Sequence, residues 1–247
     1  MVYVFLGLPL KKKRKQGKSK NIIQIRIWKI AFDFLLCFVA LTMAPVLMYK
    51  FVNPPTTPLM WIRWVDSATP QNLPRHLNNW ISIEEISKNI IKAVVAAEDQ
   101  NFFIHSGFDW LAIEYAIQTN LTTDRKVGAS TISMQTARNV FLWQTRSWFR
   151  KLLESYFTVL IEFFWSKQRI LEVYLNVIEW GDGLYGCEQA AQKYFLRSSK
   201  IISPVESAWM AAVLPSPRYW ALRPTPQHVQ ARQIKIMNTL QHMKTFK

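Results

Sequence analysis

The sequence has 247 residues, half of them hydrophobic and 14% aromatic, a composition that excludes an intrinsically disordered chain, a collagen-like repeat and a low-complexity segment. With only two cysteines, it is not a disulfide-rich scaffold either. The net charge is +15, and residues 1–29 carry nine basic and no acidic side chains. Residues 30–247 therefore contain 22 basic and 16 acidic residues, a net charge of +6. A net positive charge of this kind suits an anionic ligand or a membrane surface.

Residues 1–29 form a basic arm, whose run Lys-Lys-Lys-Arg-Lys at 11–15 would by itself suit nuclear import or nucleic-acid binding. The next stretch, residues 30–52, is almost entirely apolar, and its only two charges lie near its ends. As a helix it would measure about 34 Å, enough to cross a hydrocarbon core of about 30 Å. Trp28 and Tyr49 lie at its two edges, where aromatic rings favour the lipid interface, and the preceding basic residues predict a cytoplasmic N-terminus.

This pattern favours a single transmembrane anchor at residues 30–52. A buried core helix rarely follows a purely basic arm, and a cleavable signal peptide would have a shorter apolar stretch followed by a small-residue cleavage site. Everything after about residue 53 is therefore expected outside the cytoplasm. Because Cys37 falls inside the anchor, no disulfide with Cys187 is expected.

Residues 53–75 contain five prolines and are predicted to form a connector without regular helix. Residues 76–247 are predicted to form one mainly helical domain, since long alternating strand patterns are absent and the whole chain has only seven glycines. Ser82 and Glu85 form a capping box ahead of apolar residues at three- and four-residue steps, which predicts a helix that begins at Ser82.

Two further helices are predicted near the C-terminus. Ser203 and Glu206 form a second capping box, with a proline at the first helical position, and predict a helix to about Leu214. Thr225-Pro226 predicts the start of the last helix.

Glu98 ends the helix that is predicted from Ser82. It lies four residues after Val94 and seven after Ile91, so its carboxylate is expected on the apolar face, while Asp99 points elsewhere. Desolvation there raises the pKa of a carboxyl group toward the range in which it exchanges protons near neutrality, as a general acid or base requires. On position alone, an ordinary salt-bridged Glu at a helix end is the more common case.

Five ordered segments carry a resemblance to a known family. Residues 94–110, VVAAEDQNFFIHSGFDW, and residues 127–139, VGASTISMQTARN, closely resemble the first two signature motifs of the bacterial peptidoglycan glycosyltransferases. These are the transglycosylase domains that occur alone or in bifunctional penicillin-binding proteins. Three more segments resemble the later motifs in the expected order, namely residues 150–154, 166–195 and 206–224.

The resemblance implies a lysozyme-like, all-α glycosyltransferase domain that polymerises lipid II into glycan strands, with inversion and release of undecaprenyl pyrophosphate. Glu98 matches the family's general base, and Glu154 matches a second acidic residue near the leaving pyrophosphate or a bound metal. Arg150 and Lys151 match pyrophosphate-binding cations. The residues that match the substrate-lining segment are Ser130, Thr131, Gln135, Arg138 and Asn139.

The match departs from the family pattern at three positions. Ala129 replaces a second glycine, Met134 replaces a first glutamine, and Arg138 stands where a lysine is frequent. None of these changes removes a charge or the second glutamine, so only fine substrate contacts are affected.

The spacing of Arg150, Lys151 and Glu154 places two cations and one carboxylate on one helix face. Such a group could hold an anionic phosphate near a membrane, whereas the bland alternative is a solvated helix ion pair worth a few tenths of a kcal/mol. The surrounding segments, residues 141–149 and 156–165, are strongly aromatic. Core packing and membrane contact both remain open for them.

Other polar residues have structural interpretations. Ser130 and Thr131 lack an adjacent base and are expected to cap a helix, and His105 is expected to form structural hydrogen bonds rather than to bind zinc. Turns are predicted around Asp182-Gly183. The residues interpreted as helix termination and turns are Asn176, Gly181, Gly183 and Gly186.

The predicted function is glycan-strand synthesis at the bacterial cytoplasmic (inner) membrane, with the catalytic domain on the periplasmic or extracellular side. A monofunctional enzyme is expected, because no Ser-x-x-Lys or Lys-Thr-Gly motif of a penicillin-reactive domain occurs. The alternatives are a lysozyme-like or lytic glycan-cleaving enzyme and a non-catalytic membrane-anchored scaffold. Cleavage needs a proton on a sugar oxygen, whereas cations beside a leaving pyrophosphate favour synthesis.

The expected ligands follow from this function. They are lipid II and the growing lipid-linked glycan chain, with other cell-wall synthesis or division proteins as candidate partners. No nucleic acid is expected, because the anchor separates the basic arm from the domain. No tightly bound cofactor and no protein-ligated metal are expected, although a divalent cation such as Mg²⁺ or Mn²⁺ is a candidate.

Overall fold

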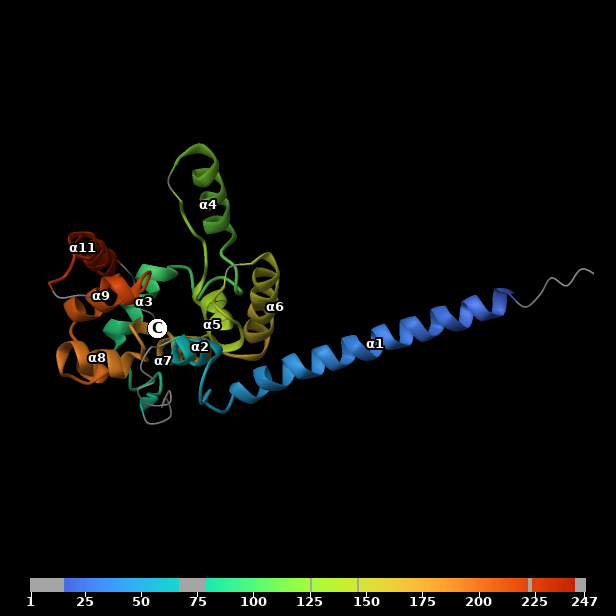
Figure 1. Cartoon of the computed structure of the whole chain (residues 1–247). Helices are drawn as coiled ribbons and strands as arrows, with labels where there is room; N and C mark the ends of the chain where they lie inside the picture. Colours follow the sequence, from blue (N-terminus) through green and yellow to red (C-terminus); the bar gives the residue numbers. More distant parts are fainter. Residues whose placement is uncertain (1–15, 67–78, 125, 146, 222–223, 243–247) are drawn as a thin grey trace, which may run out of the picture. The chain divides into compact units, whose positions relative to one another are not determined.

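The computed structural model describes residues 16–66, 79–124, 126–145, 147–221 and 224–242. The predicted basic arm up to residue 15 and the last part of the predicted connector, residues 67–75, lie outside them. The chain divides into two compact units at Pro45, each considered by itself. The described residues are mainly helical, which confirms the predicted class (Figure 1).

The elements, in chain order, are α1 (Gln16–Tyr49), α2 (Pro58–Asp66), α3 (Lys88–Glu98), α4 (Trp110–Thr122), α5 (Ile132–Phe141), α6 (Trp148–Phe164), α7 (Lys167–Val177), β1 (Glu179–Gly181), β2 (Leu184–Tyr185), α8 (Cys187–Phe195), η2 (Ser199–Ile201), α9 (Pro204–Val213), α10 (Pro217–Trp220) and α11 (Gln227–His242).

Helix α1 contains residues 30–49 of the predicted apolar stretch, and residues 50–52 follow its end. Residues Gln24–Tyr49 form 26 residues of this helix and include an 18-residue stretch with a mean hydropathy of 2.2, so the helix is long and apolar enough to cross a bilayer. Both cysteines are free, since Cys37 lies on this helix and Cys187 is buried in the second unit.

The end of α1 belongs to the second unit and is held by Trp165, which follows α6, and by Arg169 of α7. The Trp165 indole donates to the carbonyl of Val46 at 2.8 Å. The Arg169 guanidinium donates to the carbonyls of Tyr49 and Val52, each at 2.9 Å. A cation that bonds the last carbonyl of a helix satisfies a group that has no partner within the helix and also complements the helix dipole.

Two sequence expectations are wrong. The predicted connector contains α2, because Pro58 occupies the first helical position, where a proline is tolerated, and no proline follows until the helix has ended. Helix α3 begins at Lys88 rather than at Ser82. Residues 82–86 form a separate turn, and Ser87 interrupts the helical backbone with a ψ of 129° before its side chain caps the amide of Asn89.

The C-terminal predictions are confirmed. Ser203 and Glu206 form the capping box of α9, which ends before Leu214, and α11 begins directly after Pro226. The turn at Asp182-Gly183 joins β1 to β2 in a short antiparallel hairpin that the sequence patterns do not predict.

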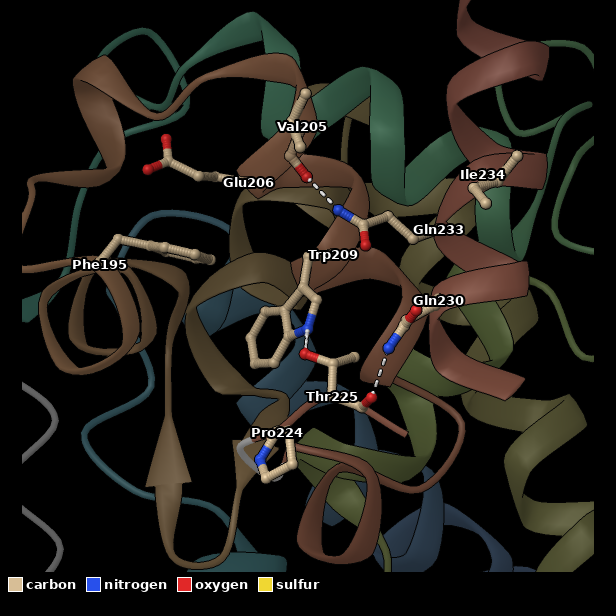
Figure 2. Close-up of a pocket in the computed structure, with 9 residues that line it drawn as sticks. All are labelled: Phe195, Val205, Glu206, Trp209, Pro224, Thr225, Gln230, Gln233 and Ile234. Atoms are coloured by element: carbon tan, nitrogen blue, oxygen red, sulfur yellow. Dashed lines mark hydrogen bonds between the residues drawn. The ribbon is translucent and has the colours of Figure 1, made fainter. Parts of the chain in front are cut away.

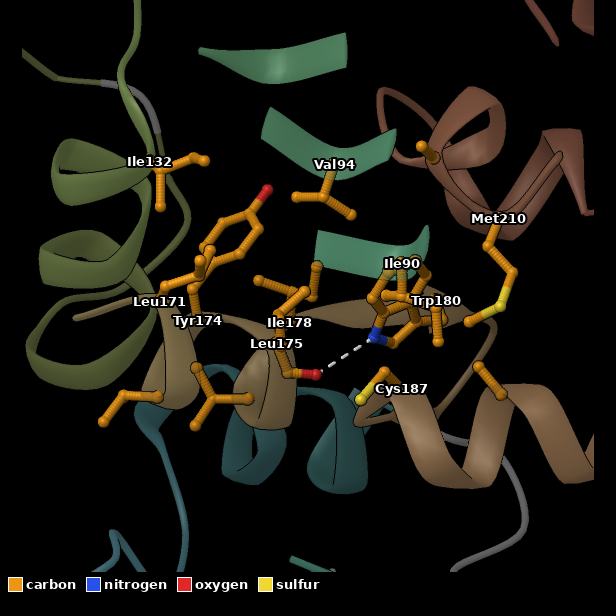
Figure 3. Close-up of a cluster of buried hydrophobic side chains, with 14 of the residues drawn as sticks. Ile90, Val94, Ile132, Leu171, Tyr174, Leu175, Ile178, Trp180, Cys187 and Met210 are labelled. Atoms are coloured by element: carbon orange, nitrogen blue, oxygen red, sulfur yellow. Dashed lines mark hydrogen bonds between the residues drawn. The ribbon is translucent and has the colours of Figure 1, made fainter. Parts of the chain in front are cut away.

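The core of the second unit lies between α3, α5, α7, α8 and α9 (Figure 3). Trp180 and Tyr174 are its largest fully buried side chains, and the Trp180 indole donates to the Leu175 carbonyl at 3.4 Å. Asn176 lies in the last turn of α7, one residue before the helix ends, and exchanges two hydrogen bonds with the backbone of Ile81. This core fixes the ends of α3 and α5, which carry most of the predicted site.

Candidate active site

Glu98 is the last residue of α3, and its carboxylate is nearly buried, with 13% of the side chain exposed. Oε2 accepts a hydrogen bond from the Gln135 amide on α5 at 3.0 Å, and Oε1 accepts one from the Arg232 guanidinium on α11 at 2.9 Å. The predicted apolar setting is confirmed, since Val94 one turn earlier is fully buried. Three separate helices therefore meet at this carboxylate.

Burial raises the pKa of Glu98 above its ordinary value of 4.5. The hydrogen bond from Gln135, the charge and hydrogen bond of Arg232 and the charge of Arg138 oppose this rise without cancelling it. A raised pKa makes the carboxylate a better proton acceptor, as a general base for a bound hydroxyl requires.

Gln135 is held in place by Tyr174 of α7. The Tyr174 hydroxyl donates to Oε1 of Gln135 at 3.1 Å, which leaves the amide nitrogen of Gln135 to donate to Glu98. Burial raises the pKa of Tyr174 well above its ordinary value, so the hydroxyl stays protonated and remains a donor. Gln135, predicted as a substrate-lining residue, thus contacts the catalytic candidate itself.

Arg232 is a site residue that the sequence patterns do not indicate. It lies on α11, 134 residues from Glu98, outside all five family-like segments. No local spacing rule connects the two positions. Only the packing of α11 against α3 brings them together.

The neighbouring Asp99 has a structural role. It is buried, it hydrogen-bonds His105 at 2.9 Å, and it accepts the amide of Ile132 at the start of α5 at 2.9 Å. Thr131 caps the same helix and donates its hydroxyl to the carbonyl of Gly107 at 2.7 Å. His105 and Thr131 therefore have the structural roles predicted for them. Their hydrogen bonds and those of Asp99 connect the segments 94–110 and 127–139 next to Glu98.

A glycine is required at position 107, where the chain packs closely against α6. Its φ is +93°, and a Cβ would lie 2.9 Å from the Thr158 side chain and 3.0 Å from that of Glu162. Only glycine combines this backbone conformation with such a close approach.

Glu154 lies on α6 and is completely buried. It is paired on one side with Arg150, which is itself 7% exposed, and on the other with the Lys151 ammonium at 2.6 Å. The predicted shared face is confirmed. The bland alternative of a solvated pair does not apply, because the Glu154 side chain is completely buried.

The remaining predicted residues lie on α5 or shortly before it. Arg138 is partly buried, its Nε has no hydrogen-bond partner, and its charge acts on Glu98. Within the described part of the chain no carboxylate pairs with its guanidinium, so it is available to an anion. Asn139 is buried and accepts a hydrogen bond from Gln144 at 3.2 Å, while Ser130 is partly exposed just before the helix.

The aromatic segments are divided between core and surface. Phe141, Phe157 and Trp165 pack into the core, and the rings of Phe141 and Phe157 stack at 4.6 Å. The opposite face of α6 and most of α4 present large apolar side chains to the surface. They include Trp110, Leu111, Tyr115, Ile117, Leu121, Trp148, Phe149, Leu152, Val159 and Phe163.

The donor set does not fit a protein-held metal at Glu154. Both of its carboxylate oxygens already bond cations, Arg150 and Lys151. Across the described residues, no group of three or more His, Cys, Asp or Glu side chains is arranged to hold a metal ion.

Comparison with known proteins places this geometry in context. A family model described as transglycosylase matches residues 67–241. Proteins named biosynthetic peptidoglycan transglycosylase are similar over most of their length. One from Bdellovibrio bacteriovorus is 50% identical over 214 residues, covering 87% of this chain and 85% of the relative. One from Xanthomonas oryzae is 47% identical over 210 residues, covering 85% of each chain. One from Bacteroides thetaiotaomicron is 42% identical over 222 residues, covering 90% of this chain and 89% of the relative.

Proposed function

The chain belongs to the transglycosylase family and is a lysozyme-like peptidoglycan glycosyltransferase of cell-wall synthesis, and from this premise we propose that it polymerises lipid II with release of undecaprenyl pyrophosphate. Its relatives are named for biosynthesis, which sets aside the glycan-cleaving and scaffold alternatives. The observation that carries the proposal is Glu98, a nearly buried carboxylate with a raised pKa in a polar cluster formed by three helices.

In the proposed reaction, Glu98 accepts the proton of the acceptor 4-hydroxyl as that oxygen attacks the anomeric carbon of the lipid-linked donor. The bond from that carbon to the pyrophosphate oxygen breaks with inversion. The leaving group departs as an anion, so the site needs positive charge there rather than a second acid.

Arg138 is the best placed cation for the pyrophosphate, because its guanidinium pairs with no carboxylate among the described residues and lies close enough to act on Glu98. Arg150 and Lys151 are proposed to contribute the net positive charge that remains after they pair with Glu154. Glu154 holds these cations in place. Since both of its oxygens already bond cations, Glu154 is not proposed as a ligand of an Mg²⁺ or Mn²⁺ ion.

The membrane is proposed to hold both enzyme and substrate. Apolar side chains along α1 are exposed, among them Trp28, Phe34 and Leu41, and such a surface is favourable in lipid and costly in water. Within the second unit, the exposed apolar faces of α4 and α6 suit insertion at the lipid interface. An enzyme that acts on a lipid-linked sugar would gain access to its substrate in this way. Other cell-wall synthesis or division proteins remain proposed partners.

Purified full-length protein incubated with labelled lipid II is expected to form polymeric glycan and to release undecaprenyl pyrophosphate. A moenomycin-type phosphoglycolipid should inhibit the reaction, since it is expected from the family resemblance to bind on the donor side. Products are resolved by gel electrophoresis and the released lipid by chromatography. Shortening of preformed glycan without polymer formation would refute synthesis.

The proposed orientation, with the N-terminus in the cytoplasm and the domain outside, follows from the basic residues that precede residue 30, where the apolar part of α1 begins. A reporter that is active only outside the cytoplasm should therefore work when fused after Pro58. The matched control is the same reporter fused at the N-terminus of the full chain, which should be inactive. Activity of a cytoplasm-only reporter after Pro58 would invert the topology.

A further inference from the structure

We propose that Arg232 is the positioning residue that keeps the Glu98 carboxylate ionised and oriented toward the acceptor hydroxyl. This inference rests on the proposed role of Glu98 as the base. Arg232 acts through Glu98, and it needs no contact with the sugar.

The geometry ties Arg232 to both the side chain and the backbone at the end of α3. The same guanidinium nitrogen donates to Oε1 of Glu98 at 2.9 Å and to the carbonyl of Ala97 at 3.2 Å. A cation at a helix C-terminus is also favoured by the helix dipole. Two anchoring points on one helix end fix the direction of the carboxylate, whereas a single flexible ion pair would not.

Helix α11 is a well-anchored support for this residue. Val229 and Ile236 are buried against the core. Elsewhere on the helix, the Gln233 amide donates to the Val205 carbonyl of α9 at 2.9 Å, and the Gln230 amide donates to the Thr225 carbonyl at 2.7 Å (Figure 2). These amides line a surface cavity of about 580 Å³ between α8, α9 and α11 that none of the predicted site residues lines. The cavity is thus separate from the Glu98 cluster.

Among the described residues, the charged and titratable groups that act on Glu98 or lie beside it each belong to a known part of the fold. Arg138 acts from α5, Tyr174 from α7 and Arg232 from α11, and Asp99 follows Glu98 at the end of α3. Asp99 is already bonded to His105, and the buried Tyr174 hydroxyl is neutral. Arg232 is the one cation that hydrogen-bonds Glu98 within the described residues.

The remaining lone pairs of Glu98 leave room for substrate. An ionised carboxylate has about four acceptor sites, and Gln135 and Arg232 take one each. Without Arg232, burial would be opposed only by the neutral amide of Gln135 and the more distant charge of Arg138. A larger share of Glu98 would then be protonated at a given pH and unable to act as a base.

The test is the pH dependence of lipid II polymerisation by the full-length protein, compared for wild type, Arg232→Gln and Arg232→Lys. The acidic limb of kcat should move upward by about one pH unit in Arg232→Gln, since an opposite charge at hydrogen-bonding distance shifts a carboxyl pKa by that amount or more. On the acidic side of the profile, the rate of Arg232→Gln should be about tenfold lower than that of wild type. This difference should shrink as the pH rises. The lysine variant should show a smaller shift, and KM should change little in either.

Arg197→Gln is the matched control. Arg197 also pairs with a glutamate, Glu206 at 3.8 Å, but 56% of its side chain is exposed and it contacts no residue of the Glu98 cluster among the described contacts. This variant should keep the wild-type profile. The melting temperature of each variant is measured in parallel, and Arg232→Lys preserves the charge if the glutamine variant does not fold.

An unchanged acidic limb in both Arg232 variants would overturn the inference. So would an equal loss at every pH accompanied by a lower melting temperature, which is the signature of a merely structural residue. The Glu98→Gln variant distinguishes failure of the proposed role of Arg232 from failure of the proposed role of Glu98. If it is inactive while the Arg232 profile is unchanged, only this inference fails, whereas wild-type activity of Glu98→Gln removes the proposed base itself.

Discussion

Replacing Arg150 with alanine is expected to destabilise the catalytic domain by about 3 kcal/mol, the lower end of the range for breaking a buried ion pair. The variant leaves the completely buried Glu154 with a single partner, the Lys151 ammonium. Lys151 cannot fully compensate, because 40% of its side chain is exposed and water screens its charge. Polymerisation should fall as well, since the proposed leaving-group cations lose their arrangement.

The free energy of unfolding, obtained from urea denaturation of the detergent-solubilised chain, measures this effect. Arg150→Ala combined with Glu154→Gln serves as the control, because it removes the unpaired charge and should recover part of the stability. Lys151→Ala should be milder than Arg150→Ala, in keeping with its exposure. Wild-type stability in Arg150→Ala together with lost activity would mean that Arg150 acts on the substrate and contributes little through Glu154.

The features that sequence predicts well here are local. The capping box at Ser203 and Glu206 is a short-range hydrogen-bond pattern, and it forms as expected. The face shared by Arg150, Lys151 and Glu154 follows from helix geometry alone. The apolar periodicity also predicts Glu98 at a helix end, where it is observed.

The features that sequence does not predict depend on tertiary contacts. Ser82 has a valid capping pattern, yet α3 begins only at Lys88. The reason is Ser87, whose backbone amide donates to the carbonyl of Ser199 at 3.1 Å instead of continuing a helix from Ser82. A capping pattern shows only that a helix can start at a position. Here the hydrogen bond between Ser87 and Ser199 determines where the helix starts.

Arg232 and Gln135 show the same limit at the site. The sequence around Arg232 does not mark it as a partner of Glu98, because the contact exists only once α11 packs on α3. Gln135 is predicted to line the substrate, and its bond to Glu98 depends on the buried Tyr174 hydroxyl. Residues that act through tertiary contacts with distant residues have no characteristic spacing in the sequence.

Replacing Glu98 with glutamine is expected to lower polymerisation by about 10²–10⁴-fold, the usual contribution of a positioned general base. Glutamine keeps the size of the side chain and can still accept a hydrogen bond, but it cannot take the proton of the acceptor hydroxyl. Binding of a phosphoglycolipid inhibitor on the donor side should persist, since the cations Arg138, Arg150 and Lys151 are untouched.

Glu98→Gln is also expected to affect thermal stability, and the direction follows from the pH dependence of stability. The pKa of Glu98 is raised in the folded state, so its contribution to stability is fully present below the unfolded value and is lost as the pH rises through the folded value. Where the carboxylate is ionised, burial gives it a desolvation cost, so Glu98→Gln should melt at the wild-type temperature or slightly above it.

The rate of lipid II polymerisation by purified Glu98→Gln, measured beside wild type and Glu85→Gln at one neutral pH, tests the central claim most directly. Glu85 also bonds a cation, Lys200 at 2.6 Å, but 52% of its side chain is exposed, so its glutamine variant should match wild type. We predict a loss of about 100-fold or more for Glu98→Gln with no loss of melting temperature. Polymerisation by Glu98→Gln at the wild-type rate would contradict the account and make Glu154 the leading candidate for the base.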